Sequence, residues 1–326
     1  MSRGFATRLF HTSAPACAVG APPAGAVPVP PGTSLFAAHL KFRLGVFSAP
    51  QLCPAGGGRT KRLEGKVILV TGSTQGCGES IAYACADEGA EGVVVCGRQD
   101  ALGEAVAAEV EARGAKSLYV KADLTNVDDV KNIIAQTDAT FGRLNGLVNS
   151  AAVATRGEWL GEGKADEELI DWLVALNFKA PFLLTQGAAE IMAREGTGGS
   201  VVNIGSINGH GGQSNLPVYS CTKGALMTMT KHASWALRNE RIRANYLAVG
   251  WMFTPAEHQL MQDEGKPESW IADADADHPF GRILRPNDIA KAVIHLLSDD
   301  SVMQSGSIID FHENYGICCW DGQPEA

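Results

Sequence analysis

The stretch that decides the fold is 66–78, which reads KVILVTGSTQGCG. Its first part, Lys66–Thr71, is a short run of apolar and β-branched residues, which is typical of a strand with both faces buried. Glycines follow, and an alanine-rich pattern over Glu79–Glu88 then predicts a helix. A buried strand that leads through a glycine-rich turn into a helix predicts the beginning of a parallel α/β sheet.

The same order of strand and helix repeats along the rest of the chain. Further strands are expected at Val93–Cys96, Leu118–Val120, Gly146–Asn149, Val201–Ile204, Ile242–Leu247 and Ser307–Phe311. Further helices are expected at Ala101–Ala112, Val127–Phe141, Glu167–Arg194, Tyr219–Asn239 and Asn287–Leu297. Because the strands are apolar throughout, they predict a parallel sheet covered on both faces. Right-handed crossovers then give a doubly wound, Rossmann-type α/β fold of about seven strands.

This pattern fits a single domain over residues 63–312. Within it, 251–280 is expected to be an insertion that forms a substrate loop, and 313–326 follows as a C-terminal tail. The composition agrees, since 45% of the 326 residues are apolar and 19% are charged, unlike a disordered or coiled-coil chain. A formal charge of −9 argues against nonspecific binding to nucleic acid. No uncharged apolar run reaches the length of about 18 residues that predicts a membrane span.

The eight cysteines show no CxxC pair and no metal-ligand spacing with histidine. The sequence therefore predicts neither a metal site nor a disulfide framework.

The first 62 residues differ from the rest of the chain in their charge. The first acidic residue is Glu64, whereas seven basic residues precede it in a segment rich in Ala, Pro, Gly and Ser. A basic, acid-poor and hydroxylated N-terminus is typical of an organelle transit peptide, and the opening MSRGFATRLFHTSAPA resembles mitochondrial presequences. We therefore expect 1–62 to be a mitochondrial transit peptide, with a plastid address or an extension without any address as alternatives.

The glycine-rich turn suggests a binding site for a dinucleotide. Its residues are Gly72, Ser73, Thr74, Gln75, Gly76, Cys77 and Gly78. Glycines permit positive φ and let the backbone approach a pyrophosphate at the positive end of the following helix. The spacing is GxxxGxG rather than the GxGxxG of other dinucleotide folds, and a purely structural loop remains an alternative.

The residues after the second strand indicate which dinucleotide would bind. An enzyme that uses NAD usually places an acidic residue there, about 20 residues beyond the glycines, to bind a ribose hydroxyl. Here the segment is Cys96-Gly97-Arg98, and the arginine could bind a 2′-phosphate, which favours NADP. An exposed loop arginine, and NAD with Asp100 as the ribose partner, are the alternatives.

A tyrosine, a lysine and a serine form the candidate catalytic group. Tyr219 and Lys223 are four residues apart in a predicted helix and therefore lie on the same face. Because a free phenol has a pKa near 10, we expect the lysine ammonium to lower the pKa of Tyr219 so that it can exchange protons. Ser206 ends a predicted strand thirteen residues upstream, and its position makes a chance pairing less probable.

With these residues in view, the chain resembles the short-chain dehydrogenase/reductase family over nearly all of residues 64–311. Further matching positions are Asp123 and Leu124 after the third strand, Asn149-Ser150-Ala151-Ala152 after the fourth, and Asn177 in the long helix. The usual NNAG stretch reads NSAA here, so Ser150 and Ala152 replace an amide and a glycine. The usual Pro-Gly before the nicotinamide-binding threonine, Thr254, reads Val249-Gly250.

The resemblance implies a role for each matching residue. Tyr219 would exchange the proton at the substrate oxygen, Ser206 would stabilise that oxygen, and Lys223 would act on the pKa of Tyr219 and bind the nicotinamide ribose. Asn177 would hold a water in the proton relay. The other cofactor contacts would come from Asp123 at the adenine, Leu124 beside it, Asn149 near the ribose and Thr254 at the carboxamide.

The function expected from these features is an NAD(P)-dependent oxidoreductase that interconverts an alcohol and a ketone or aldehyde. The stretch between Ser206 and Tyr219 is polar, carrying Asn208, His210, Gln213 and Asn215. Such a wall suits a sugar or polyol, because buried polar groups need partners. The alternatives are a 3-oxoacyl-carrier-protein reductase and a non-catalytic assembly subunit. By resemblance, we expect a homodimer or homotetramer formed through the two long helices.

Overall fold

The computed structural model describes residues 61–312. The expected transit peptide, apart from its last two residues, and the expected tail at 313–326 lie outside this part of the chain. The described residues contain a seven-stranded parallel sheet in the order β3-β2-β1-β4-β5-β6-β7. Its strands are β1 Val67–Val70, β2 Gly92–Gly97, β3 Lys116–Lys121, β4 Gly146–Asn149, β5 Gly199–Ile204, β6 Ile242–Val249 and β7 Ile308–Phe311. The predicted doubly wound fold is confirmed.

The strands are apolar because both faces of the sheet are covered by helices. In β1, Ile68 and Val70 pack into one buried cluster, whereas Val67 and Leu69 pack into another on the opposite face. Successive strand residues point to opposite faces, so a strand between two helical layers has no side exposed to water.

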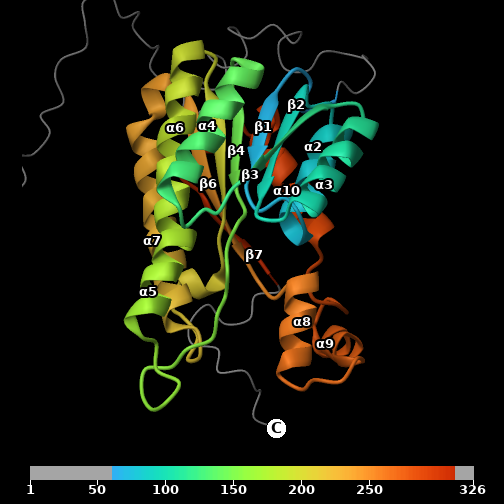
Figure 1. The fold of residues 1–326 in the computed structure, drawn as a ribbon, viewed down its shortest axis with the longest axis vertical. Helices are drawn as coiled ribbons and strands as arrows, with labels where there is room; N and C mark the ends of the chain where they lie inside the picture. Colours follow the sequence, from blue (N-terminus) through green and yellow to red (C-terminus); the bar gives the residue numbers. More distant parts are fainter. Residues whose placement is uncertain (1–60, 313–326) are drawn as a thin grey trace, which may run out of the picture. The chain divides into compact units, whose positions relative to one another are not determined.

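Two helical layers enclose the sheet (Figure 1). One layer contains α2 Gly76–Asp87, α3 Asp100–Ala112 and α10 Pro286–Leu297. The other contains α4 Val127–Phe141, α5 Glu167–Val174, α6 Ala180–Glu195 and α7 Pro217–Ala236. None of the helices in residues 61–312 has both the length and the apolar character needed to cross a bilayer.

The long helix expected over Glu167–Arg194 contains an interruption. A π-helical turn, Ala175–Lys179, separates α5 from α6 and has Asn177 at its centre. A π turn inserts one extra residue into the helix, and such turns are frequent at functional sites. The apolar pattern continues across this turn, so the sequence predicts one uninterrupted helix.

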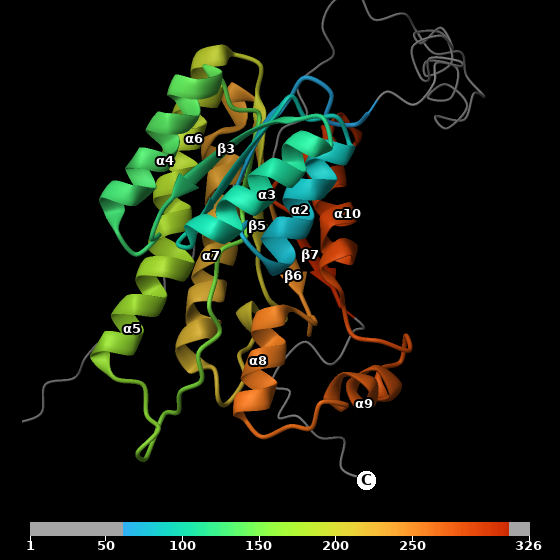
Figure 2. The same cartoon turned by 45° about the vertical axis from the view of Figure 1, so that its right-hand side comes forward.

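The insertion at 251–280 is a small helical unit rather than a loop. Its helices are α8 Pro255–Asp263 and α9 Trp270–Asp277, which lie together beyond the carboxyl ends of the strands (Figure 2). They share a buried cluster in which the Trp251 and Trp270 rings stack with centroids 5.7 Å apart. The Arg285 guanidinium binds the Asp275 carboxylate at 2.5 Å and joins α9 to the segment before α10. The insertion is therefore a well-packed unit with its own buried cluster.

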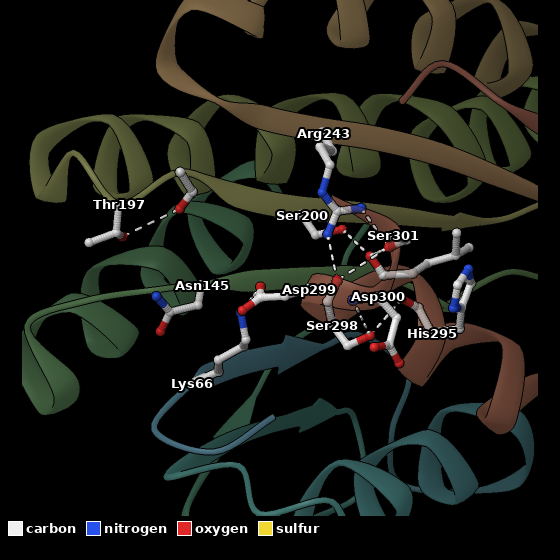
Figure 3. A network of polar contacts seen from close by, with 12 residues as sticks. Lys66, Asn145, Thr197, Ser200, Arg243, His295, Ser298, Asp299, Asp300 and Ser301 are labelled. Carbon is white, nitrogen blue, oxygen red and sulfur yellow. Dashed lines mark hydrogen bonds and ion pairs between the residues drawn. The ribbon is translucent and has the colours of Figure 1, made fainter. Parts of the chain in front are cut away.

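The opposite end of the sheet is closed by a network of polar contacts around Arg243 (Figure 3). The Arg243 guanidinium donates to the Ser298 carbonyl at 3.1 Å and to the Ser301 hydroxyl at 2.9 Å. The Ser200 hydroxyl donates to the Leu296 carbonyl at 2.7 Å. The bonds to Ser298 and Leu296 satisfy carbonyls at the C-terminal end of α10, which an α-helix leaves without partners. The contacts at this end of the sheet therefore have a structural role: they hold the end of α10 to β5 and β6.

Candidate active site

A cavity of about 1020 Å³ lies at the carboxyl ends of the strands. It is lined by segments at or just after the ends of six of them: 72–78 without Ser73, 96–98, 122–125, 150–156, 204–208, and 249–254 without Phe253. The sheet order reverses at β1, whose neighbours are β2 and β4. In open α/β sheets, ligands bind outside the carboxyl ends of the strands where the order reverses. The cavity therefore occupies the expected place for a dinucleotide.

The glycine-rich turn fits a phosphate group. Gly72 and Gly76 both have φ of +61°, a conformation that favours glycine. A Cβ at Gly78 would lie 2.4 Å from the Gly72 carbonyl oxygen, so only glycine permits this close turn. Gln75, the residue before α2, makes no capping side-chain hydrogen bond. The first backbone N–H groups of α2 are thus left without a side-chain cap beside the cavity, an arrangement that binds anions.

Two residues expected to contact the cofactor have side chains behind the cavity wall. The Ser73 hydroxyl donates to the Val70 carbonyl at 2.6 Å and accepts from the Cys96 N–H at 3.0 Å, which ties β1 to β2. The Asn149 amide donates to the Asn203 side-chain oxygen at 2.8 Å and so joins β4 to β5. Both side chains hold strands together at the base of the cavity, and neither lines it.

The residues predicted for the adenosine end do line the cavity. Arg98 is exposed there, together with Asp123, Leu124 and Thr74. A Cβ at Gly97 would lie 2.5 Å from the Thr74 methyl carbon, so the position where an acidic residue would bind ribose has no room for a side chain.

Asp123 and Asp100 differ in their surroundings. Hydrogen bonds from the Thr125 backbone and hydroxyl, together with the charge of Arg98, lower the pKa of Asp123. Asp100 instead binds Lys121 at 2.5 Å and does not line the cavity. The geometry thus places Arg98, and not Asp100, at the site.

Ser206, Tyr219 and Lys223 lie together on the cavity wall. The Ser206 hydroxyl acts on the Tyr219 phenol and favours its ionised form, which lowers the pKa of the phenol. The Lys223 ammonium donates to the Ile204 carbonyl at 2.8 Å and lies 5.6 Å from the centroid of the Tyr219 ring. The end of β5 and one turn of α7 therefore bring the three predicted catalytic side chains to one place.

Burial has the largest influence on the pKa values of this group. It raises the pKa of Tyr219 to about 12, while the Ser206 hydrogen bond acts to lower it and the charge of Glu257 to raise it. Burial also lowers the pKa of Lys223 to about 8. The sequence predicts a lowered pKa for Tyr219, and this direction is wrong for the structure, because desolvation of the phenol outweighs the effect of Ser206.

Asn177 is buried in the π turn, and protein groups occupy most of its amide. Its side-chain nitrogen donates to the Val153 carbonyl at 3.0 Å and to the Thr222 hydroxyl at 3.3 Å. Its side-chain oxygen accepts from the Val153 N–H at 3.1 Å. One acceptor position is left on that oxygen. Asn177 thus fixes the segment after β4 against α7, and a water in the proton relay could use only that remaining position.

The substrate side of the cavity contains residues that the sequence analysis does not single out. Glu257 lines the cavity, and its carboxylate accepts from the Trp251 indole N–H at 2.8 Å. Arg156 lines it as well and binds Glu264 at 2.9 Å. Both carboxylates come from α8 or its C-cap, and only the packing of the insertion brings them here.

Part of the predicted polar wall faces the cavity. Asn208 and Gln213 line it and are hydrogen-bonded to each other at 3.3 Å. His210 instead binds Asp310 on β7 at 2.8 Å, and neither His210 nor Asn215 lines the cavity. Thr254 also lines it and caps α8 by accepting from the Glu257 N–H at 3.1 Å.

Comparison with known proteins agrees with this geometry. A family model described as enoyl-(acyl carrier protein) reductase matches residues 72–312. L-fucose dehydrogenase of Bos taurus is 32% identical over 73% of this chain and 85% of its own. L-rhamnose 1-dehydrogenase (NAD(P)(+)) of Sphingomonas sp. strain SKA58 is 28% identical over 76% of this chain and 95% of its own. L-sorbose reductase of Gluconobacter frateurii, solved with NADPH and L-sorbose, has a TM-score of 0.71 at 26% identity and covers 78% of this chain and 98% of its own.

The chain belongs to the short-chain dehydrogenase/reductase family. More particularly, it is an NAD(P)-dependent oxidoreductase that acts on CH–OH groups.

Proposed function

We propose that this enzyme interconverts the alcohol and carbonyl forms of a sugar or polyol and that it prefers NADP. The observation that carries the substrate proposal is that Asn208, Gln213, Glu257 and Asp263 line the same cavity as the Tyr219 phenol. Amide and carboxylate groups bind hydroxyl groups, and they are costly to bury against an alkyl chain. The L-fucose, L-rhamnose and L-sorbose enzymes among its relatives support the same substrate class.

Each residue of the site has a different role in the reaction. The bound nicotinamide supplies the hydride acceptor or donor. In the oxidation direction, Tyr219 takes the proton of the substrate hydroxyl, and Ser206 stabilises the charge that develops on the same oxygen. Lys223, with a pKa of about 8, is mostly protonated at neutral pH and places its positive charge beside the phenol.

A substrate panel tests this proposal. The purified enzyme is mixed with NADP or NAD and with L-fucose, L-rhamnose, sorbitol or a 3-hydroxyacyl thioester, and the absorbance of the reduced nicotinamide is followed. L-sorbose and a 3-oxoacyl thioester with NADPH test the reverse direction. We expect turnover with at least one sugar or polyol and little with the thioesters. Turnover confined to thioesters would support a 3-oxoacyl-carrier-protein reductase, and none with any substrate would support an assembly subunit.

The preference for NADP rests on Arg98. We expect Arg98→Asp to lower kcat/KM with NADP by about 10- to 100-fold and to leave NAD unaffected or improved, because a charged hydrogen bond to phosphate is lost. Steady-state kinetics with both cofactors measure this. Arg238→Asp, which changes an exposed arginine outside the cavity, is the matched control. Unchanged kinetics of Arg98→Asp with NADP would contradict the assignment.

Two further proposals concern the whole chain. Its basic, acid-poor N-terminus supports a mitochondrial address for 1–62, with a plastid as the alternative. Ile170, Val174 and Phe182 are apolar and exposed on α5 and α6, which supports a homodimer or homotetramer formed through these helices and α7.

A further inference from the structure

Tyr246 is a buried tyrosine on β6 that none of the roles above includes. Its side chain is fully buried, and it does not line the cavity. Its phenol oxygen accepts a hydrogen bond from the Ser206 N–H at 2.9 Å. The same oxygen lies 3.1 Å from the Ser206 carbonyl and 3.3 Å from the Lys223 carbonyl, and its single proton is shared between these two acceptors. One phenol thus contacts the backbone of two predicted catalytic residues.

Two glycines leave space for this phenol. A Cβ at Gly205 would lie 1.8 Å from the ring carbon that bears the hydroxyl, and a Cβ at Gly209 would lie 2.7 Å from the hydroxyl oxygen. Real Cβ atoms do not approach so closely, so any larger residue at either position would displace the ring. The turn after β5 therefore closes over Tyr246 only because it carries glycine at 205 and 209.

We propose that Tyr246 is a positioning residue for the reaction, which sets Ser206, just after β5, and Lys223, on α7, in fixed relation to each other. Ser206 must present its hydroxyl to the same oxygen as Tyr219, although the two residues come from different elements. Tyr219 lies one turn before Lys223 on α7, so the tie from Tyr246 to the Lys223 carbonyl also fixes the turn that carries Tyr219. This inference rests on the proposed function, because it concerns the same catalytic group.

The phenol of Tyr246 is suited to a structural tie and not to proton transfer. Burial raises its pKa, so the hydroxyl stays neutral and can accept one hydrogen bond and donate another. Tyr246 does not line the cavity. Within residues 61–312, none of its hydrogen bonds reaches the side-chain oxygen of Tyr219. Its effect on the reaction must therefore pass through the backbone of Ser206 and Lys223.

Tyr246→Phe tests the proposal, because it removes only the hydroxyl. The Ser206 N–H then loses its partner, and we expect kcat to fall by about 5- to 30-fold, as for one buried hydrogen bond left unmade. KM for NADP should stay within about twofold, since the phosphate-binding turn is untouched. Kinetics are measured with NADP and the panel sugar that is turned over fastest. Tyr83→Phe, which removes a phenol bonded to Glu79 on α2, is the matched control.

A second readout separates positioning from a loss of stability. The Ser206 hydrogen bond lowers the pKa of Tyr219, so a displaced Ser206 should shift the pH dependence of alcohol oxidation to higher pH. In the double variant Ser206→Ala/Tyr246→Phe, the loss in kcat should be clearly smaller than the product of the two single losses. Multiplicative losses, or a lower unfolding temperature with unchanged kcat and pH profile, would overturn the proposal.

A third measurement does not depend on the substrate. The absorbance of tyrosinate is titrated against pH in the protein with NADP bound, and Tyr219→Phe identifies the signal of Tyr219. We expect Tyr246→Phe to move that signal to higher pH even if no sugar is turned over. An unmoved signal would overturn the positioning role, whereas a failed substrate panel would overturn only the proposed function.

Discussion

Tyr219→Phe will reduce turnover by about 10²- to 10⁴-fold, the contribution usual for a positioned general acid or base. Phenylalanine keeps the ring against Lys223 and removes only the group that exchanges the proton. Neither Arg98 nor the glycine-rich turn is changed, so NADP should bind with nearly unchanged affinity. Turnover is measured with the best panel substrate, and binding by the change in protein fluorescence on addition of NADPH.

The pH dependence of the unmodified enzyme follows from the same residue. Oxidation of an alcohol needs Tyr219 unprotonated, so its rate should rise with pH toward the raised pKa of the phenol. Reduction needs the phenol protonated and should fall over the same range. Opposite slopes in the two directions are expected, and both should vanish from the residual rate of Tyr219→Phe.

The control for this variant lies on the same helix. Cys221→Ser changes an exposed residue of α7 two positions away and should leave turnover and the pH profile unchanged. If Tyr219→Phe kept more than about a tenth of the original turnover, the phenol could not be the proton donor and acceptor.

Gly205→Ala is expected to give the largest loss of stability. The added Cβ would lie 1.8 Å from a ring carbon of Tyr246, and that ring is fully buried and held through its hydroxyl. Overpacking in a core costs about 1–3 kcal/mol, and we expect about 3 kcal/mol because the ring has no free space to enter. Denaturant-induced unfolding measures the change. Turnover of any folded fraction should fall too, because the displaced ring is the one that holds Ser206.

A second substitution distinguishes the clash from a general intolerance of alanine. In Tyr246→Ala, the ring is absent, so adding Gly205→Ala should cost much less than in the original chain. Gly157→Ala is the control, since its Cβ would meet no atom closer than 3.4 Å. Equal costs of Gly205→Ala with and without Tyr246 would show that the contact does not explain the loss.

Local patterns predicted the sheet and most of its helices well. The helix expected near Val127–Phe141 and the strand at Gly146–Asn149 have the observed bounds, because apolar periodicity and short buried runs are local signals. Ser206, Tyr219 and Lys223 line one cavity, as their places at a strand end and on one helical face predict. Regular elements and the ends of parallel strands can therefore be inferred without tertiary contacts.

Features that depend on tertiary packing could not be inferred in this way. The π turn at Asn177 leaves the apolar pattern intact, and Glu257 reaches the cavity only through the packing of α8. The pKa of Tyr219 depends on how far the phenol is desolvated, which its spacing from Lys223 does not reveal. Tyr246 reads as an ordinary strand residue, because its partners are 40 and 23 positions away in the chain.

The separate aromatic cluster of the insertion has a consequence for how this enzyme could diversify. The stacked rings of Trp251 and Trp270 stabilise α8 and α9 within the insertion itself. Ser206, Tyr219 and Lys223 are instead held by β5, β6 and α7. Mutations in α8 at positions other than Glu257, whose charge acts on the pKa of Tyr219, need not disturb the proton-transfer chemistry. Selection for a new substrate could thus act on one module while the reaction itself is inherited unchanged.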